Sequence, residues 1–154
     1  MTEAGVPADD DTARVNTERA YTGGIGSRRE LRERVLSLLY EAESKACPIG
    51  DVLDGLPLAP DPFVDQLARG VGEHQLDIDE KLAEHARGWT LERMPATDRA
   101  ILRMATYELG WCPEVPTAVA ISEAVELAKS YSTDDSGRFV NGMLSVIASE
   151  MRPG

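Results

Sequence analysis

Two short segments of the sequence carry side chains that could grip an anionic or aromatic ligand. The first, RRELRER over residues 28–34, has four arginines against two glutamates at the start of a predicted helix. Cations at a helix N-terminus are unfavourable against the helix dipole, so these arginines gain little for folding and favour a bound anion. The second is Arg138 followed by Phe139, near the start of the last predicted helix. A guanidinium beside a half-exposed ring is typical of sites that bind single-stranded RNA by stacking.

Each segment also has a purely structural interpretation. An amphipathic helix with a solvated, mixed-charge face would place Arg29 and Arg32 beside its apolar stripe without any ligand. Phe139 falls on the margin of the apolar stripe of the last helix, and such a ring is often part of the core. The acids Asp134 and Asp135 are explained by the helix itself, because they suit its cap and first turn. Both interpretations stay open on these residues alone.

No motif in the sequence predicts catalysis, a metal site or a cofactor. His74 and His85 have no acid or cysteine paired with them at the spacing of metal ligands. Cys47 and Cys112 form neither a C-x-x-C pair nor a disulfide framework. The sequence contains no G-x-S-x-G, and its GGIG segment lacks the lysine of a phosphate-binding loop. We therefore predict that the chain is not an enzyme and has no catalytic residues, metal ligands or cofactor.

Length and charge restrict the remaining classes of protein. The 154 residues suffice for one domain with an apolar core, and 42% of them are hydrophobic. No apolar run approaches the roughly 18 residues of a membrane span, and the acidic N-terminus lacks a secretory signal, so we expect a cytoplasmic protein. The net charge of −11 opposes binding of nucleic acid by charge alone. RNA binding would need a local basic patch or a basic partner.

The apolar periodicity predicts an all-α fold, a compact single-domain bundle of about seven helices over residues 28–154. Residues 1–27 are rich in Gly, Asp, Thr and Ala, and we expect them to form a disordered acidic tail. Capping signals mark two helix starts, Asp61 followed by Pro62 and a capping box at Asp77. Apolar alternation of period two never persists, which argues against a strand-based fold.

Four segments together resemble the NusB family of transcription antitermination factors. They are RRELRERVLSLLYEAE, DRAILRMATYEL, VPTAVAISEAVELAKSYS and DDSGRFVNGML, within about Arg28 to Glu150. The resemblance implies a non-enzymatic, all-helical protein that binds the single-stranded boxA element of ribosomal RNA leader transcripts. It implies that the protein binds this RNA together with NusE, a small-subunit ribosomal protein, within the antitermination complex of RNA polymerase. This binding would support rRNA synthesis and maturation. Monomers and homodimers both occur in the family.

The resemblance also implies site residues. The RNA face would combine the start of the first helix with the start of the last, and it would lie between these two segments. The NusE contact would lie on the middle helices, in a stretch where seven acids outnumber three bases over residues 73–98. The RNA-face residues are Arg28, Arg29, Arg32, Arg138 and Phe139, and the partner-surface residues are Glu92, Arg93 and Asp98.

One alternative from another class remains. The chain could be a helical adaptor or a homodimeric structural protein that binds no RNA. That hypothesis requires the arginines of residues 28–34 to be incidental and Phe139 to be fully buried.

Overall fold

A computed structural model describes residues 25–86 and 90–153, with only the backbone for residues 25–27. This part of the chain contains seven α-helices, one 3-10 turn and no strand, which confirms the predicted all-α fold. The first helix, α3 (Ile25–Ser44), begins slightly before the predicted start of the helical domain; the rest of the predicted tail lies outside the described residues. The chain divides within α3 into two units, residues 1–34 and 35–154.

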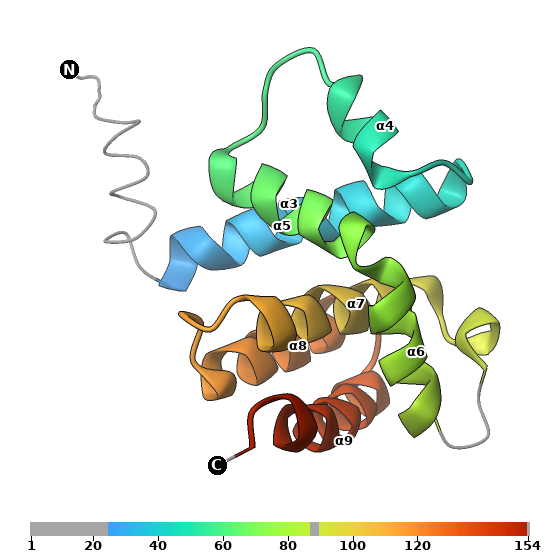
Figure 1. Cartoon of the computed structure of the whole chain (residues 1–154), viewed down its shortest axis with the longest axis vertical. Helices are drawn as coiled ribbons and strands as arrows, with labels where there is room; N and C mark the ends of the chain where they lie inside the picture. Colours follow the sequence, from blue (N-terminus) through green and yellow to red (C-terminus); the bar gives the residue numbers. More distant parts are fainter. Residues whose placement is uncertain (1–24, 87–89, 154) are drawn as a thin grey trace. The chain divides into compact units, whose positions relative to one another are not determined.

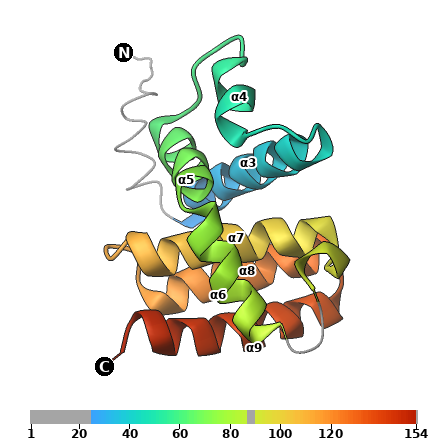
Figure 2. The same ribbon diagram turned by 45° about the vertical axis from the view of Figure 1, so that its right-hand side comes forward.

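The second unit is built around α7 (Ala96–Trp111), which is buried on nearly every face. It packs against α8 (Thr117–Tyr131) and α9 (Asp134–Met151), and these three helices run side by side (Figure 1). The helix α6 (Gln75–His85) crosses α7 and α9, as Figure 2 shows. Its buried residues include the charged Asp98, Arg99 and Glu108 beside the apolar ones, and α7 forms the centre of the core.

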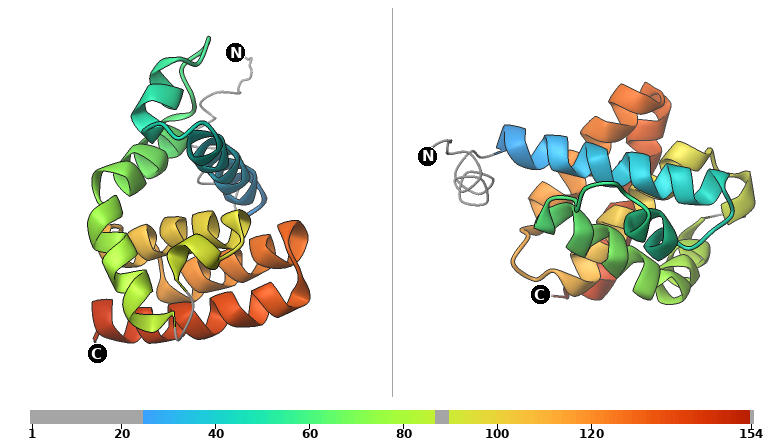
Figure 3. Two further views of the ribbon diagram at one scale, coloured as in Figure 1. Left: turned by 90° about the vertical axis from the view of Figure 1, so that its right-hand side faces the viewer. Right: turned by 90° about the horizontal axis from the view of Figure 1, so that it is seen from above.

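The remaining elements of this unit complete its other side. The short helix α4 (Ile49–Asp54) packs on α5 (Pro62–Glu73), and the two lie next to each other in Figure 3. The 3-10 turn η1 (Leu91–Arg93) precedes α7. Asp61 caps α5 as predicted, because its carboxylate accepts the Phe63 N–H at 2.8 Å. None of the described helices has the length and apolarity that a membrane crossing needs.

The start of α6 differs from the prediction. We expected a capping box at Asp77, but α6 begins at Gln75, directly after α5, so that prediction is wrong. His74 separates the two helices, and its side chain makes no capping hydrogen bond. Instead its ring stacks on Trp111 with the ring centroids 4.4 Å apart. Tertiary packing against α7, rather than a local cap, therefore marks this helix start.

The end of α3 places a non-glycine residue in the left-handed region. Ala46 has a φ of 53°. The Cys47 N–H donates to the Ala42 carbonyl and the Ala46 N–H donates to the Glu43 carbonyl, both at 3.0 Å, which is the Schellman pattern of helix ends. Glycine adopts this conformation without the steric cost that a Cβ brings.

Replacing Ala46 with glycine is therefore expected to stabilise the protein. The free energy of unfolding should rise by about 0.5–1 kcal/mol, because the strain at the left-handed position is larger than the entropy cost of glycine. Urea unfolding measures this change. A variant less stable than the wild type would show that the end of α3 is unstrained.

Candidate nucleic-acid interface

Hydroxyl groups fix the start of α9. Thr133 is the N-cap, and its Oγ1 accepts the Ser136 N–H at 3.0 Å. The same hydroxyl donates to Ser136 Oγ at 3.2 Å, and Ser132 Oγ lies 2.9 Å from Ser136 Oγ. Asp134 and Asp135 occupy the first turn, where acids are favourable against the helix dipole; this place was predicted for Asp135, whereas Asp134 was a candidate cap. The backbone that carries the following residues is therefore held at several points.

Arg138 and Phe139 follow this fixed turn. The Arg138 side chain is 75% exposed and pairs with Asp135, an exposed contact that can exchange for another anion at little cost. Phe139 is half-buried. Its ring is therefore not fully buried, as the adaptor hypothesis would require, and not fully exposed either. Gly137 allows the close approach of α8, because a Cβ there would lie 3.0 Å from Lys129 Cγ. A cation and a partly open ring thus stand side by side on a rigid helix start.

The arginines at the start of α3 belong to the first unit and differ in exposure. Arg28 and Arg29 are half-buried, whereas Arg32 is only 4% exposed. This differs from the surface cation expected at that position. The proximity of these arginines to the ring on α9 stays a prediction.

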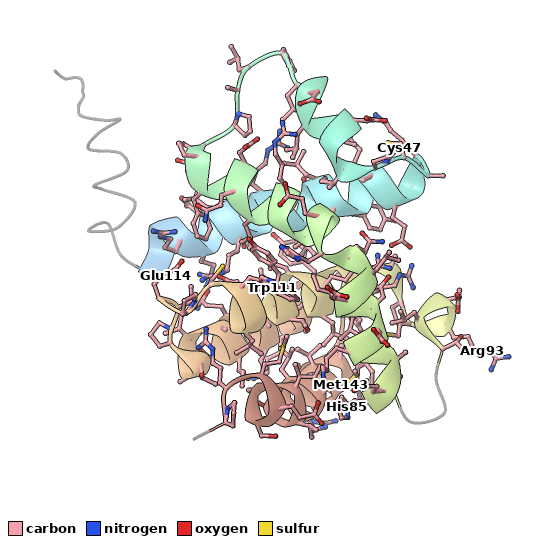
Figure 4. The ribbon with its side chains drawn as sticks, in the orientation of Figure 1. Cys47, His85, Arg93, Trp111, Glu114 and Met143 are labelled. Carbon is pink, nitrogen blue, oxygen red and sulfur yellow. The ribbon has the colours of Figure 1, made fainter. Side chains whose placement is uncertain are left out.

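The three predicted partner-surface residues also differ in exposure to solvent. Glu92 and Arg93 are exposed on η1, and Figure 4 shows Arg93 extending away from that turn. Asp98 is only 3% exposed, and its Oδ2 accepts the Ser136 hydroxyl at 2.8 Å. It lies on the same face of α7 as Leu102, one turn further on, and both are buried. Asp98 is therefore an internal residue and not the surface contact that we predicted.

A cleft of about 710 Å³ opens beside Glu92. Its charged lining comes from separate parts of the second unit: Glu43 on α3, Asp79 on α6, and Arg99 and Arg103 on α7. Arg103 Nε and Nη2 donate to the two Asp79 oxygens at 2.8 and 3.0 Å. Sequence reasoning missed this cleft because its residues come from distant segments, and no local spacing marks it.

Arg99 connects the cleft to η1. Its Nη1 donates to the Leu91 and Met94 carbonyls at 2.6 and 2.8 Å, and its other nitrogens pair with Glu43. Burial, and then the nearby charge of Arg103, lower the pKa of Arg99. A single buried guanidinium thus holds η1 against the first turn of α7.

A charged cluster joins α6 to α9. The ligand atoms of Glu84, His85 and Glu150 lie within 4.8 Å of one another, and Figure 4 labels His85 at this cluster. The Lys81 ammonium lies 3.0 Å from Glu150 Oε1 and 3.5 Å from Glu84 Oε1, so it already supplies a positive charge. The hydrogen bond from Lys81, and then the His85 ring 3.1 Å from the other oxygen, lower the pKa of Glu150. The cluster is an ion-pair bridge between two helices.

Comparison with known proteins finds one family over most of the chain. The NusB family model matches residues 29–149. The transcription antitermination protein NusB of Thermobifida fusca is 48% identical over 124 residues, which is 78% of this chain and 87% of that protein. The NusB protein of Saccharopolyspora erythraea is 51% identical over 130 residues, 80% of this chain and 88% of that one.

Solved structures show the same similarity in three dimensions. The structure of T. maritima NusB has a TM-score of 0.73 and 36% identity, and the match covers 82% of this chain and 93% of that one. A structure of the antitermination factors NusB and NusE in complex with dsRNA has a TM-score of 0.69 and 22% identity. That match covers 80% of this chain and 96% of the other, and at this identity it establishes the fold alone.

Proposed function

The chain belongs to the NusB family, and on that premise we propose that it is a transcription antitermination factor that binds RNA together with NusE. The family consists of transcription factors and not of enzymes, which agrees with the prediction that the chain is not an enzyme. The proposal includes the finer assignment implied by the sequence: single-stranded boxA RNA of rRNA leader transcripts, bound in the cytoplasm within the RNA polymerase antitermination complex.

The observation that carries RNA binding is the start of α9. The Arg138 side chain is 75% exposed, and its neighbour Phe139 is half-buried on a helix start fixed by hydroxyl groups. A ring held rigidly with part of its surface open can stack on an unpaired base, and stacking tolerates any base. We assign phosphate contacts to Arg28 and Arg29, which are more exposed than Arg32, and give Arg32 a supporting role.

Charge explains why a partner takes part. A chain with a net charge of −11 repels RNA over most of its surface, so a few arginines give only weak binding. A basic partner would add the positive potential that is missing. We propose that NusE docks on η1 through Glu92 and Arg93, at the edge of the adjoining cleft. In the solved NusB–NusE complex the RNA is double-stranded.

Fluorescence anisotropy with a short boxA RNA tests this function. We expect weak, salt-sensitive binding to the protein alone and binding at least about tenfold tighter at saturating NusE, a gain typical of coupled sites. A double-stranded version of the same RNA, which has fewer open bases, should bind less tightly if the ring stacks. Undetectable binding of both RNAs with and without NusE would contradict the function and favour the adaptor or homodimer.

Charge reversal at Glu92 tests the partner surface in the same assay. Glu92→Lys should reduce the gain in RNA affinity that NusE provides, because it opposes docking of a basic protein. Glu126→Lys is the matched control, since it makes the same charge change on an exposed position of α8. Equal gains for the two variants would remove η1 from the partner surface.

A further inference from the structure

We propose that the first turn of α7 couples NusE binding to RNA binding, with Asp98 as the residue that positions the start of α9. This inference rests on the function proposed above. It starts from the fact that two adjacent residues, Asp98 and Arg99, hold two different segments of the second unit. One segment presents the proposed RNA contact, and the other presents the proposed partner contact.

A hydrogen bond between buried groups connects the first turn of α7 to the proposed RNA contact. Asp98 Oδ2 accepts the Ser136 hydroxyl at 2.8 Å, and both residues are buried. Ser136 is the centre of the hydroxyl group cluster that includes the N-cap, Thr133. Two and three residues further on, the chain reaches Arg138 and Phe139. The carboxylate of Asp98 therefore holds α9 at the turn from which the proposed RNA contacts project.

Asp98 is also incompletely satisfied. Its Oδ1 is buried and has no hydrogen-bond partner among the described residues. A buried carboxylate with a missing partner costs stability compared with a neutral residue of similar size. A small movement of the surrounding groups changes the hydrogen bonding of this carboxylate. Asp98 is therefore sensitive to displacement of the turn that carries it.

The guanidinium of Arg99 connects the same turn to η1, the proposed partner contact. It donates to two main-chain carbonyls, Leu91 at 2.6 Å and Met94 at 2.8 Å, on either side of the exposed Glu92 and Arg93. A protein that docks on η1 and moves it must therefore move Arg99 or break these bonds. The displacement arises in the same helical turn as Asp98.

The packing of α7 allows little of that displacement to be absorbed elsewhere. The helix is enclosed by α5, α6, α8 and α9, and closely packed interiors transmit small shifts. A ligand that favours one arrangement of the turn then changes the affinity of the other ligand, and the effect is reciprocal. The chain gains a route by which NusE binding organises the RNA contact at α9.

The test is the ratio of RNA dissociation constants without and with saturating NusE. We expect Asp98→Ala to lower this ratio by about fivefold or more, by weakening RNA binding in the presence of NusE. RNA binding to the variant alone should also weaken, because Asp98 positions the RNA contact, but by a smaller factor than binding in the presence of NusE. Ser136→Ala removes the same hydrogen bond from the other side, so it should lower the ratio similarly and serves as the second variant if Asp98→Ala folds poorly.

Two controls separate positioning from general stability. Asp98→Asn keeps an oxygen that can accept the Ser136 hydroxyl, so it should retain most of the ratio. Val52→Ala truncates a buried residue of α4 and lowers stability without touching the first turn of α7. Its ratio should equal that of the wild type. A drop for Val52→Ala as large as that for Asp98→Ala would overturn the proposal, because instability alone would then explain the effect.

The remaining outcomes of the binding assay show whether the coupling role or the proposed function is wrong. If the wild type binds the RNA more tightly with NusE and both Asp98→Ala and Ser136→Ala keep that gain, the coupling role is wrong and the function stands. A wild type whose RNA affinity does not respond to NusE also overturns the coupling. If the wild type binds no RNA with or without NusE, the proposed function itself is contradicted.

Discussion

Replacing Arg152 with alanine is expected to lower the free energy of unfolding by about 3 kcal/mol, as estimated from the loss of charged hydrogen bonds at a partly buried site. All five N–H donors of its guanidinium have an acceptor, at distances from 2.6 to 3.1 Å. Four acceptors are main-chain carbonyls at the end of α7 and in the loop after it. Two of these carbonyls also accept a main-chain N–H, Glu108 from Cys112 and Cys112 from Val115, and the guanidinium adds a second donor to each. One cation thus caps α7 and ties the end of α9 to it. The acceptors are Glu108, Leu109, Cys112, Val115 and the Thr117 hydroxyl.

Chemical unfolding of two further variants completes that test. Arg152→Lys keeps the charge but not the planar fork, so most of the loss should remain. Arg138→Ala removes an arginine that is 75% exposed, and its effect on stability should stay within about 0.5 kcal/mol. If Arg152→Ala were as stable as Arg138→Ala, the guanidinium would not cap α7.

Phe139→Ala is expected to weaken RNA binding in the presence of NusE by roughly 1–3 kcal/mol, the amount that stacking of one base on an aromatic ring contributes. The ring is half-buried, so its truncation should cost less stability than the roughly 3–5 kcal/mol of a fully buried phenylalanine. Anisotropy gives the first quantity and urea unfolding the second. The ratio of the two effects separates a stacking ring from a core ring.

Phe139→Leu is the matched control, because leucine keeps an apolar side chain at this position but has no π-face. Its stability should stay close to that of the wild type, while its RNA affinity should fall nearly as far as that of Phe139→Ala. A loss of about 3–5 kcal/mol in stability with RNA affinity unchanged would show that the ring belongs to the core.

Features that depend on neighbouring residues along the chain could be predicted from the sequence. The all-α fold follows from apolar periodicity, and the start of α5 follows from Asp61 and Pro62, because an N-cap bonds only within its own first turn. The exposure of Arg138 could be predicted in the same way, from its angle on α9. Such features depend on a few consecutive residues.

Features that depend on distant segments could not be predicted. Asp98 has the spacing of an exposed acid, but α7 is buried on nearly every face, so helical periodicity does not identify a solvent side. The start of α6 depends on the stacking of His74 on Trp111, which is far away in the sequence. The acceptors of Arg152 lie 35 to 44 residues before it.

UV cross-linking of the assembled complex of this chain, NusE and boxA RNA tests most directly that the RNA is bound by the starts of α3 and α9. Cross-linked peptides identified by mass spectrometry should include residues 28–34 and the segment with Arg138 and Phe139, since stacked rings cross-link efficiently to bases. Phe139→Leu should abolish the second cross-link and keep the first. Cross-links confined to other helices, with neither segment attached to RNA, would contradict this assignment.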